Sequence, residues 1–215
     1  MASEMLRDAC LRAFLDLVAT RGFERVSLDA VAAQAGVALS ELRAAYGTPL
    51  DLVAAFLRAT DRQVLAEGGP DGVDLAEPAQ ERLFEVLMRR LDALEPHKAA
   101  VASLMRSARR NPLLALALLR LSVRSQRWML AAAGIDATGL SGDARAHGLA
   151  LLFGRLVDVW LEDDDPGLAR TMAQLDRELQ TGAKLLGMLD DLATIATLGK
   201  PRRGRAKVEE TAPTS

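Results

Sequence analysis

Residues 27–52 read SLDAVAAQAGVALSELRAAYGTPLDL, and this stretch decides the fold. Ser27 is placed to cap a first short helix, whose apolar residues recur at helical spacing. Gly36 permits the left-handed backbone that ends a helix, and Ser40 begins a second one. Two short helices joined by a tight turn form a helix-turn-helix, a layout suited to presenting one helix end to DNA.

The residues on both sides of this turn follow the pattern AxxLFxxxGFxxVSLxxIAxxAGVSxxxLYxxFxSKxxL. The matching positions are Ala13-Phe14, Gly22-Phe23, Val26-Ser27-Leu28, Val31-Ala32, Ala35-Gly36-Val37, Leu42, Tyr46-Gly47 and Leu52. This pattern resembles the N-terminal domain of TetR-type transcriptional regulators, and the resemblance covers about the first 60 of 215 residues.

The resemblance implies which side chains meet DNA. We expect phosphate contacts at Ser27 and Thr48. The residues expected to face the groove are Leu39, Ser40, Glu41, Arg43 and Ala44, and Tyr46 is also expected to contact DNA. Arg43 and Pro49 replace the Tyr and Lys that are usual in the family. Arg43 can still donate in a planar fork to a phosphate or a base, whereas Pro49 cannot replace a cation and Glu41 adds a negative charge.

Composition predicts an all-α protein. Half of the residues are apolar, Ala and Leu abound, and no alternating run of β-branched and aromatic residues suggests a strand. The single cysteine, Cys10, excludes an internal disulfide and fits a reducing cytoplasm. No signal sequence and no apolar run of about 20 residues is present, so we expect no stable membrane insertion.

The charge of the N-terminal region is unusual for a DNA-binding domain. Residues 1–62 hold seven arginines, no lysine and eight acidic residues, a net charge of −1. Neutralisation of phosphates by cationic side chains supplies much of the affinity for DNA. These arginines must therefore lie close to the phosphates, or cations elsewhere in the chain must contribute. The segment 200–207 carries five cations in eight residues. It is interpreted either as a disordered solubilising tail or as an arm that touches nucleic acid or anionic membrane.

The chain divides into a head and a body. We expect a DNA-binding domain at 1–66, a linker at 67–77, a helical ligand-binding and dimerisation domain at 78–198, and a basic tail at 199–215. The Gly-rich run at 68–72 marks the boundary; a phosphate-binding loop would need a preceding strand and a following GKS or GKT. The predicted body helices span 78–94, 96–110, 113–133, Ser141 or Asp143 to 161, and 166–189.

A small hydrophobic ligand would lie among the helices from Pro78 to Trp160. Its candidate walls, each equally good as core, are Met88, Met105, Trp128, Met129 and Phe153. The acidic run 162–165 precedes Pro166, which favours helix capping over a cation site. No catalytic or metal-binding spacing stands out, so we expect neither an enzyme nor a bound metal or cofactor.

Composition predicts an all-α fold, and the resemblance to TetR-type regulators implies a homodimer that binds a double-stranded DNA operator as a ligand-responsive repressor. A looser similarity, at 83–98 and 159–176, is to TetR-like proteins that approach the ubiquinone-biosynthesis accessory proteins. Those proteins use the TetR fold to bind lipid and have lost DNA binding. This alternative accounts for the acidic head, for the replacements at Arg43 and Pro49, and for the apolar body.

Overall fold

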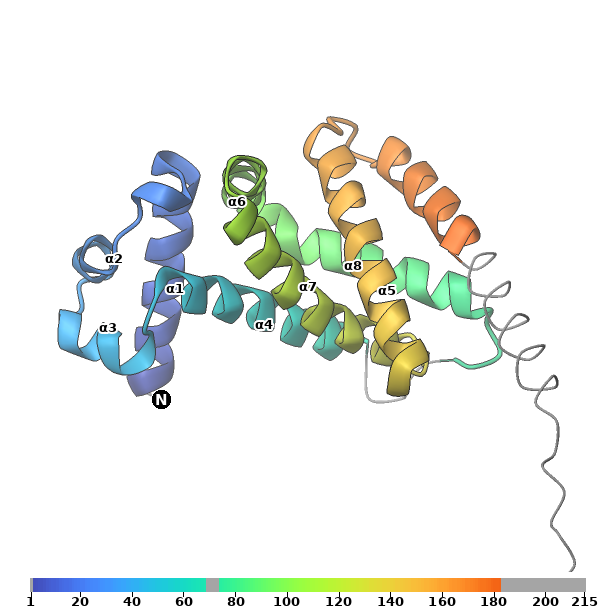
Figure 1. The fold of residues 1–215 in the computed structure, drawn as a ribbon, viewed down its shortest axis with the longest axis horizontal. Helices are drawn as coiled ribbons and strands as arrows, with labels where there is room; N and C mark the ends of the chain where they lie inside the picture. The colour runs from blue at the N-terminus through green and yellow to red at the C-terminus, as the bar shows by residue number, and fades with distance from the viewer. Residues whose placement is uncertain (1, 69–73, 183–215) are drawn as a thin grey trace, which may run out of the picture.

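The computed structural model describes residues 2–68 and 74–182, and every regular element within these ranges is a helix. Figure 1 shows a small head at one end of the molecule and a larger helical body at the other. The helices are α1 (Ala2–Arg21), α2 (Leu28–Ala35), α3 (Leu39–Ala45), α4 (Pro49–Glu67), α5 (Ala79–Leu94), α6 (Lys98–Arg110), α7 (Pro112–Ala132) and α8 (Gly139–Leu161). Two short 3-10 turns lie at Phe23–Arg25 and Glu95–His97, and residues 169–182 are also helical.

The head is formed by α1, α2 and α3, as the sequence predicts. Phe14 and Leu17 on α1 and Leu42 on α3 are fully buried in its core. Gly36 has φ 67°, and the N–H of Val37 donates to the carbonyl of Ala32, which closes the end of α2. Ser27 occupies the position before α2, but its hydroxyl oxygen accepts no backbone N–H from the first turn of the helix.

Helix α4 joins the head to the body. Its N-terminus is held by a reciprocal cap, because Asp51 accepts the N–H groups of Gly47 and Thr48 while its own N–H donates to the Thr48 hydroxyl oxygen. Pro49 takes the first helical position, where its missing N–H costs no hydrogen bond. The helix packs against α1 in the head and against α5 and α7 in the body, so one rigid element spans both parts (Figure 1).

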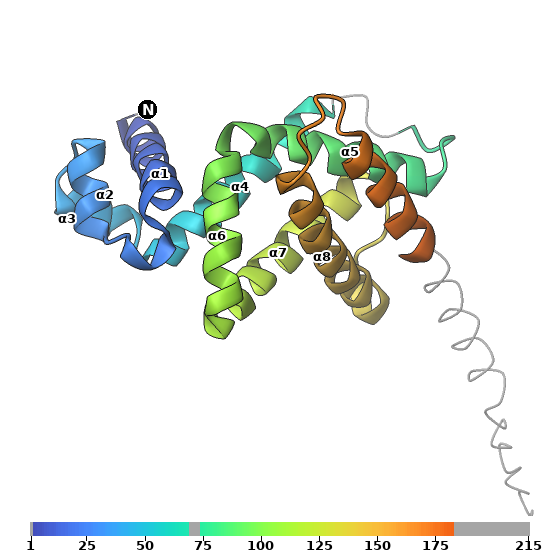
Figure 2. The same ribbon diagram turned by 90° about the horizontal axis from the view of Figure 1, so that it is seen from above.

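A second connection between head and body runs through α6. Helix α1 packs against α6, and Figure 2 shows α6 lying between the head and the rest of the body. The Ser107 hydroxyl on α6 donates to the Glu24 carboxylate in the turn after α1, at 2.8 Å. This bond and the backbone amide of Glu24 lower the pKa of that carboxyl. The head is therefore attached to the body at two places.

The body helices begin and end close to their predicted limits. Asn111 caps α7 by accepting the N–H groups of Leu113 and Leu114, and Pro112 opens the helix as expected. Helix α6 begins at Lys98 rather than at Pro96, because Pro96 lies in the 3-10 turn. Helix α7 packs against α8, and α4 lies against α5 and α7.

Two more predicted helix starts, besides that of α6, are wrong. Helix α8 begins at Gly139, not at Ser141 or Asp143, because Asp136 accepts the N–H and hydroxyl of Thr138 and sets the turn earlier. The last helix begins at 169 rather than at Pro166. Its cap is Asp163, whose carboxylate accepts both the N–H and the hydroxyl of Thr171.

The expected domain limits fall partly outside the described residues. The linker assigned to 67–77 begins where α4 ends, but residues 69–73 are not described. The predicted end of the last helix and the basic tail at 199–215 also lie outside the described ranges. Within those ranges no helix is both long and apolar enough to cross a membrane.

Candidate DNA-binding and ligand-sensing sites

Helix α3 presents one exposed face and one buried residue. Leu42 is buried in the head, whereas Ser40, Glu41, Arg43 and Ala44 are exposed. Leu39, at the start of the helix, leaves 51% of its surface exposed although it is a large apolar side chain. A single exposed leucine is common on protein surfaces, so the side chains of this face together, rather than Leu39 alone, form the candidate contact surface.

The charged side chains on this face have different surroundings. Glu41 accepts the N–H of Ala38 at 3.1 Å, so its carboxylate is partly engaged in capping its own helix. Arg43 forms no ion pair with any residue in the described ranges. Its guanidinium is thus the free cation of the face, able to donate in two parallel bonds to a phosphate or a guanine edge.

Two of the expected phosphate contacts are hydroxyl groups that precede helices. Ser27 and Thr48 are both exposed, one before α2 and one before α4. The Thr48 oxygen accepts the N–H of Asp51, which leaves the hydroxyl hydrogen free to donate. Hydroxyl groups are among the side-chain groups that donate to phosphate oxygens in protein–DNA complexes.

Tyr46 does not belong to the exposed set. Only 7% of its surface is accessible, and this burial raises the pKa of its phenol. The residue follows the last turn of α3 and packs in the core of the head. The predicted DNA contact at Tyr46 is therefore wrong, because this side chain is not on the exposed face of α3.

A buried polar network links three helices of the body. The Asp61 carboxylate on α4 accepts from the Arg90 guanidinium on α5 and from the Ser125 hydroxyl on α7, each at 2.5 Å. Arg90 is 1% exposed; its guanidinium lies 5.3 Å from the centre of the Phe153 ring and 3.6 Å from the Met129 sulfur. Burial lowers the pKa of Arg90, and the Asp61 carboxylate opposes that shift. The pair therefore fixes α4 to the body through charge.

Three buried atoms beside this network have no hydrogen-bond partner among the described residues. They are Nε of Arg90 and both side-chain amide atoms of Gln126, a fully buried residue on α7. This cluster was not predicted from the sequence, although one signal was available. Arg90 falls on the apolar stripe of α5 that includes Leu83, Leu87 and Leu94, where a charge needs a partner.

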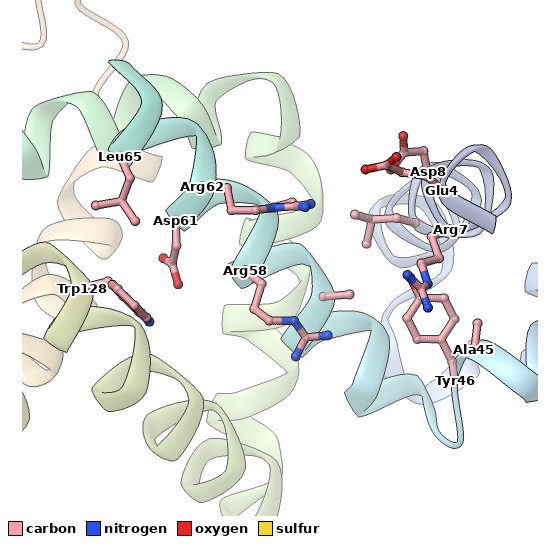
Figure 3. Close-up of a pocket in the computed structure, with 13 residues that line it drawn as sticks. Glu4, Arg7, Asp8, Ala45, Tyr46, Arg58, Asp61, Arg62, Leu65 and Trp128 are labelled. Carbon is pink, nitrogen blue, oxygen red and sulfur yellow. The ribbon is translucent and has the colours of Figure 1, made fainter. Parts of the chain in front are cut away.

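The predicted ligand walls are not gathered around one cavity. Met129 and Phe153 adjoin the buried network, whereas Met88 and Met105 are half-buried elsewhere in the core. Trp128 is 55% exposed. It lines an open cleft of about 440 Å³ between the head, α4 and α7, together with Arg7, Arg58, Arg62 and Asp61 (Figure 3). Whether the five residues contact a ligand stays a prediction.

The acidic run before the last helix is used for capping. Asp163 binds Thr171, and Asp165 accepts the N–H groups of Gly167 and Ala169. In the part of the chain that the structure describes, no group of three or more acidic, histidine or cysteine side chains is placed to hold a metal ion.

Solved structures similar to this one are transcriptional regulators. A TetR regulator from Nitrosomonas europaea superposes with a TM-score of 0.63 at 24% identity, covering 82% of this chain and 97% of its own. One from a Rhodococcus species gives 0.58 at 21%, covering 84% and 97%. A third, from Streptomyces coelicolor, gives 0.56 at 18%, covering 94% and 92%.

This protein has the TetR fold. No family model matches its sequence, and no curated protein matches it either. The predicted all-α architecture is confirmed, and in this fold α3 is the second helix of the helix-turn-helix.

Proposed function

We propose that this protein is a ligand-responsive transcriptional regulator of the TetR type, which binds a DNA operator as a homodimer and acts as a repressor. The exposed face of α3 is the observation that carries the proposal. Leu39, Ser40 and Arg43 project from a helix whose position is fixed by buried Leu42. A helix-turn-helix placed in this way inserts its second helix into the major groove.

The side chains of the face have distinct roles in this proposal. Arg43 reads a base edge or grips a phosphate, and Leu39 makes an apolar contact in the groove. The hydroxyls of Ser27 and Thr48 donate to phosphates on either side. Because the net charge of residues 1–62 is −1, few cations are released on binding and the salt dependence of the affinity should be shallow.

Dimerisation is supported by the outer surface of α8. Leu151 is exposed there, and a Cβ added at Gly148 or Gly154 would meet no atom within 4 Å. A second copy of the chain could approach such a surface closely. The Arg155 guanidinium forms two bonds with the Glu178 carboxylate, which fixes the helix at 169–182 against α8. A two-fold dimer would place two copies of α3 one DNA turn apart.

The response to a ligand would pass through α4. This helix begins directly after α3 and carries Asp61 of the buried network. A ligand that binds one arrangement of the body more tightly than the other would shift α4 and change the separation of the two heads.

The test is retention of genomic DNA fragments by the purified protein at moderate salt, followed by sequencing. Enrichment of a palindromic site is expected, and the absence of any enriched site would contradict the proposal. Arg43→Ala should then weaken binding to that site by about 1–3 kcal/mol. Arg120→Ala removes an exposed arginine of the body and serves as the matched control. Equal losses in the two variants would show that only overall charge matters.

A further inference from the structure

The polar cluster in the core of the body is incomplete. Arg90 uses Nη1 to bind Asp61, while its Nε–H has no partner among the described residues. Gln126 has neither a donor for its amide oxygen nor an acceptor for its amide nitrogen there, although it is fully buried. Buried polar groups in native proteins are nearly always paired, so unpaired ones indicate a place for a bound group.

The unpaired amide of Gln126 lies on the same side of α7 as Ser125 and Met129, which contact Asp61 and Arg90. Ser125, Gln126 and Met129 fall within an arc of about 100° of that helix, given 3.6 residues per turn. The Met129 sulfur contacts the Arg90 guanidinium, and Gln126 lies three residues, or about one helical turn, before Met129 on α7. The surroundings are otherwise apolar, because the Phe153 ring lies against the same guanidinium. A molecule received here would meet a cation and an amide at one end and apolar side chains elsewhere.

We propose that Arg90 and Gln126 receive the carboxylate of an amphiphilic monoanion, which replaces Asp61 as the partner of Arg90. In its effect on DNA this rests on the proposed function, whereas the binding itself does not. The Arg90 Nε–H and the Gln126 amide N–H would donate to the oxygens of the ligand. The apolar part of the ligand would lie against Met129 and Phe153.

Charge explains why the ligand is an anion. A buried guanidinium keeps its proton, and leaving it without a counter-charge is strongly unfavourable. A neutral ligand therefore cannot release Asp61, but a carboxylate can exchange with it and keep the core neutral. The released side chain has a place to go: Asp61 also lines the cleft that contains Arg58 and Arg62 (Figure 3).

The exchange would free α4. Asp61 joins this helix to α5 through Arg90 and to α7 through Ser125, so both bonds are lost when a ligand takes its place. Arg90 is 1% exposed and Gln126 is fully buried, so the site is closed to solvent in this structure. Binding requires α4 and α7 to part, which couples the anion to the helix that carries the head.

The probe for this site is sodium octanoate, with 1-octanol as its neutral counterpart, and the readout is affinity by calorimetry and melting temperature without DNA. Asp61→Asn removes the internal competitor and leaves Arg90 without a counter-charge. This variant should melt below the wild type, and octanoate should bind it at least about tenfold more tightly and restore its melting temperature. Octanol should bind both proteins equally.

Gln126→Leu is the second variant, because it keeps the volume of the side chain and removes the unpaired amide. It should melt at or above the wild-type temperature and bind octanoate at least about tenfold more weakly than the wild type. Should Asp61→Asn not fold, the comparison of wild type with Gln126→Leu decides alone. Octanoate binding that is unchanged by either substitution, or no stronger than octanol binding, overturns the proposal. Octanoate binding as expected, together with no operator binding by the wild-type protein in the absence of octanoate, would instead refute the proposed function.

Discussion

Replacing Arg90 by Met tests the ion pair that fixes α4 to the body. Met fills much of the volume of the arginine stem but offers no donor, so Asp61 keeps only its bond from Ser125 in the network described here. Removing one partner of a buried pair costs about 3–5 kcal/mol. The Asp61 side chain is 9% exposed and lines a cleft that water can enter. We therefore expect a loss of about 3 kcal/mol, which lowers the melting temperature by about 6–12 °C.

The double variant Asp61→Leu/Arg90→Met separates lost charge from lost packing. Removing both charges should leave the free energy of unfolding within about 1 kcal/mol of the wild-type value, because apolar replacement of a buried pair is often neutral. Urea unfolding followed by circular dichroism measures all four proteins of the cycle. A loss below about 1 kcal/mol for Arg90→Met, or a double variant as unstable as the sum of the single ones, would refute the reasoning.

Two further predictions concern the helix ends near the head. Asp51→Ala removes the acceptor of the Gly47 and Thr48 N–H groups and should destabilise the fold by about 1 kcal/mol in urea; unchanged unfolding would speak against the cap. Burial lowers the pKa of His97, so the unfolded chain binds more protons below about pH 6.5. Stability should thus fall as the pH drops through that range, and His97→Gln should show a smaller fall; equal slopes would contradict this.

Local rules account for the parts of the fold that could be predicted. The left-handed residue at Gly36 and the cap and proline at Asn111-Pro112 depend on a few neighbouring residues, and each ends or begins a helix where expected. The predicted start of α8 is wrong because the Asp136 side chain bonds to Thr138 and forms a turn there, before the predicted caps at Ser141 and Asp143. Turn chemistry of this kind is visible in the sequence, but several residues offered equally good caps.

The candidate sites were predictable only to the extent that helical register determines exposure. Register places Arg43 about 100° away from buried Leu42 around α3, whereas Leu39 lies only about 60° from Leu42 and is nevertheless 51% exposed. It does not place Tyr46, because the burial of that residue depends on the packing of the whole head. The Asp61–Arg90 pair joins residues 29 positions apart on two helices. Sequence could show that Arg90 needs a partner but not which acidic residue supplies it.

The bond between Glu24 and Ser107 limits how the head can move. The head is held by α4 and also by the contact of α1 with α6, where this bond lies. A rigid body that is attached at two separate points, as the head is, can rotate only about the line that joins those points. Motion of α4 would therefore become a rotation of α3 about one axis rather than a free swing. Ser107→Ala removes this hydrogen bond but leaves the packing of α1 on α6, so it should loosen the axis of rotation without abolishing it.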